Sequence, residues 1–169
     1  MKSILIVLAP ENFRDSEFIV PHAFWLQMGA EISTTSLSTE SVGKFGYQVQ
    51  HDFTLAEADA EEYDGIFFVG GGGSLVYRDN EVAKELTQRF VSAGKAYGAI
   101  CAAPQNFAHW GLLAGKQCTG HNADGEFARL CAEVGAEFVD TPAVVDGKLC
   151  TGTGPSAAEL TALKFWEIL

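Results

Sequence analysis

Short apolar runs alternate along this chain with longer segments of helical periodicity. The runs at 3–9 and 64–69 are apolar almost throughout, which is typical of strands buried on both faces of a parallel sheet. The segment 80–93 instead repeats its apolar residues at helical spacing and ends at Gly94. These patterns predict strands at 3–9, 31–38, 64–69, 97–100, 116–119, 137–140 and 143–151, a hairpin-like excursion at 43–55, and helices at 15–28, 80–93, 104–113, 124–134 and 155–169.

The order of these elements predicts the fold class. Strands that alternate with helices of this length form right-handed βαβ units, so we expect a mostly parallel sheet with helices on both faces. A chain of 169 residues is the size of one domain, here 1–169. Ligands of such α/β proteins bind outside the carboxyl ends of the strands, and we expect the functional site there.

Charge and cysteine content exclude several classes of protein. The net charge of −11 argues against nucleic-acid partners, whose phosphates require clustered Lys and Arg, and against anionic membrane surfaces. No apolar stretch approaches the roughly 20 residues of a membrane helix. The apolar run after Lys2 breaks at Pro10 without a signal-peptide cleavage site. The four cysteines include no Cys-x-x-Cys pair, which predicts reduced thiols in the cytoplasm and no metal site.

The strongest candidate for chemistry is Cys101, which ends the apolar run at 97–100. Pro104, three residues later, fits the first turn of a helix, so Cys101 is predicted to lie on a sharp strand-to-helix turn. The positive end of that helix would lower the pKa of the thiol and favour a nucleophilic thiolate. The alternative is a small buried side chain packed under a loop.

A run of glycines at 70–73 follows the buried strand at 64–69. Glycines there let the backbone turn sharply and present N–H groups, and an oxyanion hole for a neighbouring nucleophile is the simplest function. A flexible loop is the alternative. A dinucleotide-binding fingerprint is excluded because Leu75 breaks the glycine spacing, and no Gly-Lys-Ser/Thr follows for a P-loop.

Glu17 and His121 are predicted to approach the same edge of the sheet. Glu17 lies in the first turn of the first helix, where it either interacts with the helix dipole or turns inward to meet Cys101. Burial in the second case would raise its pKa and let it donate a hydrogen bond to the thiolate. His121 lies between a strand and a helix, and is a candidate general base or proton shuttle.

The segment Ala99-Ile100-Cys101-Ala102-Ala103-Pro104 resembles the nucleophile elbow of the ThiJ/PfpI superfamily, in particular its DJ-one branch. The resemblance extends through Glu17 with Pro21, the strand and loop at 64–71, and Thr151-Gly152-Thr153-Gly154-Pro155. It implies a flavodoxin-like three-layer sandwich of the class I glutamine-amidotransferase type. It also implies a homodimer that needs no cofactor.

The resemblance also assigns roles to residues. Cys101 would be the reactive cysteine, Glu17 its protonated partner and His121, 20 positions after the cysteine, the nearby histidine. The amides of Gly72 and Ala102, with Gly71 beside them, would form an oxyanion or sulfinate pocket. Peptidase-type members carry histidine directly after the cysteine, where this chain has Ala102.

The activity predicted on these grounds is that of a glyoxalase or deglycase. Cys101 would attack a small 2-oxoaldehyde or a glycated substrate, with Glu17 and His121 moving protons. One alternative is an oxidative-stress sensor or chaperone-like protein in which Cys101 is oxidised to a sulfinate. A cysteine peptidase or amidase is a further alternative, for which the chain supplies no well-placed general base.

Overall fold

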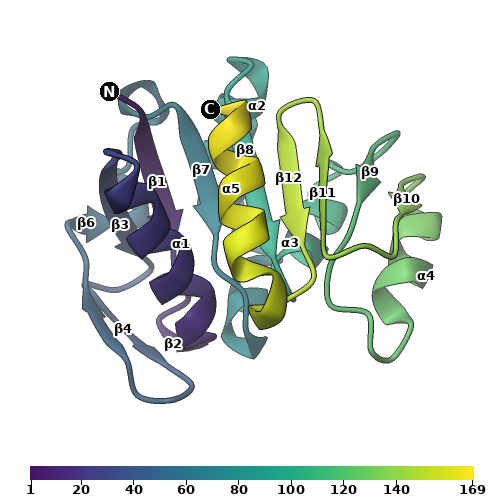
Figure 1. Ribbon diagram of the computed structural model, residues 1–169, viewed down its shortest axis with the longest axis horizontal. Helices are drawn as coiled ribbons and strands as arrows, with labels where there is room; N and C mark the ends of the chain where they lie inside the picture. The colour runs from purple at the N-terminus through teal and green to yellow at the C-terminus, as the bar shows by residue number, and fades with distance from the viewer.

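The computed structural model describes residues 1–169 and is organised around a seven-stranded sheet (Figure 1). The strand order is β11-β12-β8-β7-β1-β3-β6, and every neighbouring pair is parallel except β11 and β12. A mostly parallel sheet was predicted and is confirmed. The strands are β1 (Ser3–Val7), β3 (Glu31–Ser36), β6 (Phe53–Thr54), β7 (Gly65–Phe68), β8 (Ala96–Ile100), β11 (Ala143–Asp146) and β12 (Leu149–Gly152).

Helices cover both faces of this sheet. Helices α1 (Asp15–Gln27) and α5 (Ala158–Ile168) lie side by side on one face, and α2 (Glu81–Ser92) and α3 (Pro104–His109) lie on the other (Figure 1). Trp25 of α1 is fully buried and its indole N–H donates to the Ala162 carbonyl of α5 at 2.9 Å. This bond fixes α1 against α5 and therefore fixes where the first turn of α1 lies.

Smaller elements surround the main sheet. Strands β2 (Glu11–Phe13), β4 (Glu40–Gly43) and β5 (Gln48–Gln50) form a three-stranded sheet, in which β4 and β5 are the antiparallel hairpin expected near 43–55. Strands β9 (Gln117–Cys118) and β10 (Glu137–Phe138) pair only with each other, beside α4 (Glu126–Glu133). Four 3-10 turns complete the chain: η1 (Leu55–Glu57), η2 (Ala60–Glu62), η3 (Gly72–Tyr77) and η4 (Pro155–Ala157).

The predicted strand at 143–151 is wrong as a single strand. Its apolar residues belong to the antiparallel pair β11 and β12, which are joined by a turn at Gly147 with a φ of 62°. Glycine adopts this left-handed conformation at little cost, so it permits the reversal. The chain after β12 therefore returns to the carboxyl edge of β8, next to the predicted elbow.

Asp15 lies at the start of the first helix but does not cap it. Arg14 occupies the N-cap and Asp15 is the first helical residue. The Asp15 carboxylate instead accepts the backbone N–H groups of Phe45 and Tyr47, each at 2.9 Å. It thereby joins the turn of the β4–β5 hairpin to the start of α1.

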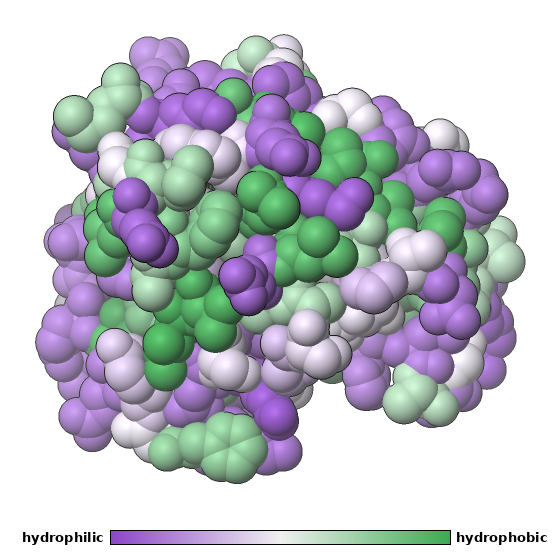
Figure 2. Space-filling model, in the orientation of Figure 1, coloured by the Kyte–Doolittle hydropathy of each residue, from purple (hydrophilic) through white to green (hydrophobic).

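The surface over α1 and α5 is rich in apolar side chains. Figure 2 shows them gathered over these two helices, and Ile19, Leu26, Leu160 and Leu163 are between 39% and 52% exposed. None of the helices combines the length and apolar character needed to traverse a bilayer.

Candidate functional site

Cys101 lies on a strained turn at the carboxyl end of β8. Its φ is 62°, a left-handed conformation that costs free energy in a residue with a side chain. Two backbone bonds hold it there: its N–H donates to the Gly152 carbonyl at 2.9 Å, and its carbonyl accepts the His121 N–H at 2.7 Å. Pro104 begins α3, as the sequence predicted. The turn is thus an elbow that directs the thiol away from the sheet.

Glu17 turns inward and is fully buried. A Cβ built on Gly154 would lie 3.8 Å from Glu17 Oε1 and 3.9 Å from Cys101 Sγ, so one small volume borders both groups. A Cβ on Gly70 would contact Glu17 Oε2 and lie 2.7 Å from Cys101 Cβ. Three elements therefore bring the carboxyl and the thiol together: α1, the loop after β7 and the elbow after β8.

Burial raises the pKa of Glu17 to about 7. The thiol of Cys101, the Arg14 guanidinium and the Gly70 N–H act in the opposite direction and are outweighed. Neither carboxyl oxygen has a hydrogen bond of ordinary geometry within the chain. The sequence predicted that burial would raise the pKa of Glu17, and the structure shows this rise. The carboxyl therefore gains or loses its proton near neutral pH.

The predicted low pKa of the Cys101 thiol is wrong. Burial and the neighbouring Glu17 charge raise its pKa to about 11, although the N–H groups of Gly71 and Ala102 act to lower it. The N–H groups at the start of α3 and after β7 lower the pKa of this thiol by less than burial and the Glu17 charge raise it. Because thiol and carboxyl interact, they titrate as a pair, and ionising the thiol requires a proton on Glu17.

The N–H groups beside the thiol come from two loops. Gly71, after β7, and Ala102, next to the cysteine, both supply backbone donors to Cys101. Gly72 begins η3, and a Cβ on it would meet no atom within 4 Å. The backbone donors beside the thiol are therefore those of Gly71 and Ala102, and Gly72 lies one residue further along.

His121 lies beside the elbow with an exposed side chain. Its imidazole makes no hydrogen bond to Cys101; the two residues are joined through the backbone. It lines an open groove of about 450 Å³ together with Asn122, Asp140 and Gly154, among others. A substrate in this groove would lie between the imidazole and the glycine that borders the thiol.

Two residues of the site were missed as individual candidates. Gly154 borders the groove on one side and Glu17 and Cys101 on the other, and its place two residues after the last strand is the signal that could have pointed to it. Arg14 lowers the pKa of Glu17 and lies over the Phe45 ring, with 5.0 Å between guanidinium carbon and ring centroid. Nowhere do three His, Cys, Asp or Glu side chains group to hold a metal ion.

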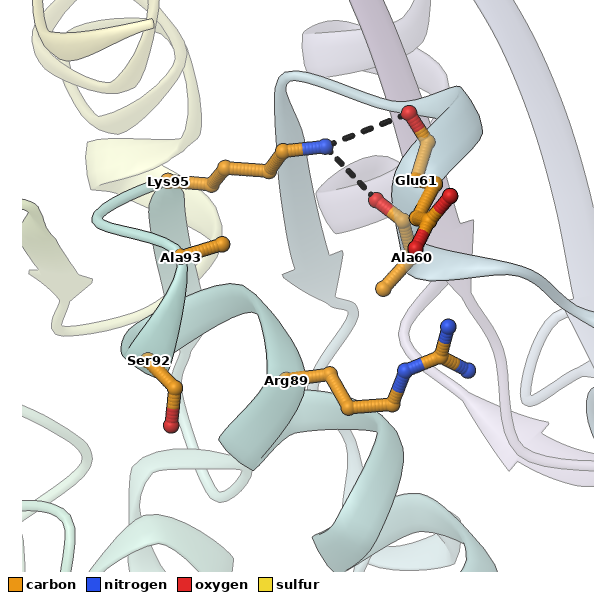
Figure 3. Close-up of a pocket in the computed structure, with 6 residues that line it drawn as sticks. All are labelled: Ala60, Glu61, Arg89, Ser92, Ala93 and Lys95. Atoms are coloured by element: carbon orange, nitrogen blue, oxygen red, sulfur yellow. Dashed lines mark hydrogen bonds between the residues drawn. The ribbon is translucent and has the colours of Figure 1, made fainter.

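A second open groove, of about 570 Å³, lies at the amino ends of β7 and β8 (Figure 3). Lys95 reaches across it and donates to the carbonyls of Ala60 and Glu61, at 2.8 and 3.3 Å. Arg89 is paired with Asp59 at 2.6 Å. The cationic groups of this groove are thus already engaged in pairs with protein groups.

A Gly70→Ala variant tests how closely the site is packed. The added methyl group would press against the Ile100 carbonyl and Glu17, so we expect unfolding free energy to fall by about 2 kcal/mol. Urea denaturation measures this change. Gly72→Ala is the matched control in the same loop and should change stability by less than about 0.5 kcal/mol. Equal effects of the two substitutions would contradict close packing at Gly70.

The fold and site define a class: an α/β protein with a cysteine on a strand-to-helix elbow beside a buried carboxyl. A family model described as the DJ-1/PfpI family matches residues 2–168, and the chain belongs to this family. The chain is 33% identical over 163 residues to an uncharacterized protein of Methanocaldococcus jannaschii, which covers 95% of this chain and 79% of that relative. It is 30% identical to Deglycase TK1284 of Thermococcus kodakarensis over 166 aligned residues. The aligned region covers 98% of each of the two chains.

Solved structures agree with this assignment. A ThiJ/PfpI domain protein from Brachyspira murdochii matches with a TM-score of 0.92 at 25% identity, covering 98% of this chain and 95% of the other. DJ-1beta of Drosophila melanogaster matches with a TM-score of 0.89 at 29% identity, covering 98% and 89%. The predicted α/β fold is therefore confirmed, as is the predicted family.

Proposed function

We propose that this protein is a cofactor-independent cysteine enzyme of the glyoxalase or deglycase type, acting on 2-oxoaldehydes or their adducts. The observation that carries the proposal is the fully buried Glu17 carboxyl next to the strained Cys101. Relatives named deglycases, such as that of Thermococcus kodakarensis, support the same class of substrate. The roles of Cys101, Glu17 and His121 below belong to this proposal.

The first step forms a bond between Cys101 Sγ and the aldehyde carbon. The thiol is protonated at neutral pH, and Glu17, with a pKa of about 7, accepts its proton as the sulfur attacks. The aldehyde oxygen gains negative charge and takes a proton to give a hemithioacetal. The N–H groups of Gly71 and Ala102 stabilise that charge as it develops.

The second step moves a proton between carbons. His121, at the rim of the groove, removes the proton from the carbon bound to sulfur, which gives an enediol, and returns it to the adjacent carbon. The hydroxyl on the sulfur-bearing carbon gives up its proton and becomes a carbonyl, while the oxygen of the former carbonyl takes up a proton and becomes a hydroxyl. The product is a thioester, so one carbon is oxidised and its neighbour is reduced without an external electron carrier. Water then attacks the thioester carbon, the carbon–sulfur bond breaks and a 2-hydroxy acid leaves.

The direct test is formation of lactate from methylglyoxal by the purified protein, with Cys101 shown by mass spectrometry to be reduced. We expect steady turnover without added metal or cofactor. His121→Ala should lower kcat about 10²-fold, because a positioned base is lost while the nucleophile remains. Absence of lactate from protein with a reduced Cys101 would overturn the proposal.

An oxidant sensor is the second candidate function. The observation in its favour is that Glu17 and the Gly71 and Ala102 amides all border Cys101, where they can donate to sulfinate oxygens. In the proposed cytoplasmic location thiols are kept reduced, so such oxidation would be a signal. Protein that forms no lactate but accumulates a stable Cys101 sulfinate at low peroxide would favour this function.

We also propose a homodimer. Its support is the apolar surface over α1 and α5 that Figure 2 shows, because exposed apolar patches of this kind mark interaction sites. Helix α1 carries Glu17 near its first turn, so a second copy packed on this surface would hold that helix in place. Sedimentation velocity of the purified chain distinguishes dimer from monomer.

A further inference from the structure

Two cysteines outside the site form a buried pair. Cys118 of β9 and Cys131 of α4 are both fully buried, and their sulfur atoms lie 3.5 Å apart. A disulfide bond is about 2.05 Å long, so the two sulfurs are about 1.5 Å from bonding distance. Nothing in the proposed reaction uses this pair, and both thiols are free.

The pair spans the segment that carries His121. The chain leaves β9 at Cys118, contributes His121 to the groove, and returns through α4 to Cys131. The Cys118 carbonyl accepts the Val139 N–H at 2.8 Å, which holds β9 against the strand that follows α4. A bond between the two sulfurs would therefore close a loop of chain from Cys118 to Cys131. This loop includes His121, which lines the groove.

Helix α4 is lightly attached to the rest of the molecule. It has eight residues, of which only Phe127 and Cys131 are buried. A short helix with only two fully buried side chains, and with Leu130 packed partly against the core, opens locally at a lower free energy than the core, and opening exposes both sulfurs to solvent. Cys150 differs, because it lies in β12 under α5 with its thiol directed at the Thr161 carbonyl and no second sulfur beside it.

We propose that Cys118 and Cys131 form an internal disulfide bond when the protein meets a hydroperoxide, and that this bond fixes the segment bearing His121. One thiolate attacks a peroxide oxygen, the O–O bond breaks, and the departing oxygen takes a proton as water or an alcohol. The sulfenic acid so formed is attacked by the second sulfur, its S–O bond breaks, and hydroxide leaves with the remaining thiol proton as water. Two thiols are oxidised and one peroxide is reduced.

The two sulfurs are suited to different roles in this reaction. Donation by the Cys118 thiol lowers the pKa of Cys131, while the same interaction and burial raise the pKa of Cys118. Cys131 is therefore the thiol that ionises first and attacks the peroxide. Its position on α4, the element that opens, gives it access to solvent before Cys118.

The experiment uses the Cys101→Ser protein, in which oxidation at the elbow cannot interfere, and the wild type beside it. Each is titrated with hydrogen peroxide, denatured in N-ethylmaleimide and mapped by mass spectrometry without reduction. We expect Cys118 and Cys131 to lose their labels together and to appear in one cross-linked peptide, with Cys150 fully labelled. Dithiothreitol should restore both labels.

A second readout tests whether the bond fixes the segment. Arg129 lies on α4 between the two cysteines and is an exposed site for trypsin. The cross-linked protein should be cut after Arg129 about 10-fold more slowly than the reduced protein, because the bond suppresses opening of α4. Cys131→Ser should abolish the cross-link and the protection.

Three results would overturn the proposal. Complete labelling of both cysteines at peroxide concentrations that oxidise Cys101 in the wild type would show that the pair does not react. A cross-link to another chain, or oxidation of either sulfur to a sulfinate without a cross-link, would exclude the internal bond. An unchanged rate of cleavage at Arg129 in cross-linked protein would show that the disulfide bond does not fix the segment bearing His121.

Discussion

A Cys101→Ser protein should convert methylglyoxal to lactate at least about 10³-fold more slowly than the wild type. Serine keeps the size and the backbone geometry of the elbow, but its hydroxyl is far harder to ionise than a thiol. Glu17, with a pKa of about 7, is too weak a base to remove the hydroxyl proton. Lactate measured over time at saturating substrate gives the ratio of kcat values directly.

Cys150→Ser is the matched control for this substitution. It makes the same change of sulfur to oxygen at a buried position outside the site, and its hydroxyl can still donate to the Thr161 carbonyl. We expect kcat to stay within about twofold of the wild type at a temperature where the variant is folded. If Cys101→Ser retained more than a tenth of the activity, covalent catalysis by Cys101 would be ruled out.

The elbow could be predicted from local sequence because its causes are local. An apolar run that ends three residues before Pro104 requires a strand, a sharp turn and a helix start in that order. The strained φ of Cys101 follows from the same constraint. The approach of Glu17 depends instead on how α1 docks, which the Trp25 bond to α5 fixes across 137 positions of sequence.

The error in the thiol pKa has a related cause. The position of Cys101 before a helix is visible in the sequence, and the helix end does favour a thiolate. Burial and the charge of Glu17 are products of tertiary packing, and they outweigh the helix end. The thiol therefore depends on its neighbour for ionisation, which makes Glu17 a base for the thiol in addition to a hydrogen-bond donor to the thiolate.

Edge elements were less predictable than the centre of the sheet. The central strands are apolar on both faces and stand out in the sequence. The segments at 116–119 (Lys-Gln-Cys-Thr) and 137–140 (Glu-Phe-Val-Asp) contain polar residues at half or more of their positions, and they form β9 and β10 in a separate pair. Which partner such a short, partly polar strand finds is decided by contacts distant in sequence.

Glu17→Gln should stabilise the protein at alkaline pH by about 3 kcal/mol and leave it little changed near pH 4.5. The folded state holds the Glu17 proton up to a pKa of about 7, whereas the unfolded chain releases it at 4.5. The stability due to the protonated carboxyl is therefore complete below pH 4.5 and is lost as the pH rises through 7. Glutamine has nearly the same shape and carries no charge, so it avoids this loss.

Urea denaturation at a series of pH values between 4.5 and 8 measures the difference between variant and wild type. That difference should grow with pH across this window and level off above 7. Glu31→Gln, at an exposed glutamate, is the control and should change stability by less than about 0.5 kcal/mol at every pH. A difference that is constant with pH would mean that Glu17 ionises equally easily in the folded and unfolded chains.

The same variant separates stability from catalysis. Glutamine cannot accept the Cys101 proton, so the more stable protein should have a lower kcat, and the activity that remains should lose its dependence on a group with a pKa near 7. A buried acid retained at a cost to stability is expected where that acid has a chemical task. A variant that was both more stable at pH 8 and fully active would leave the buried carboxyl without a role in the reaction.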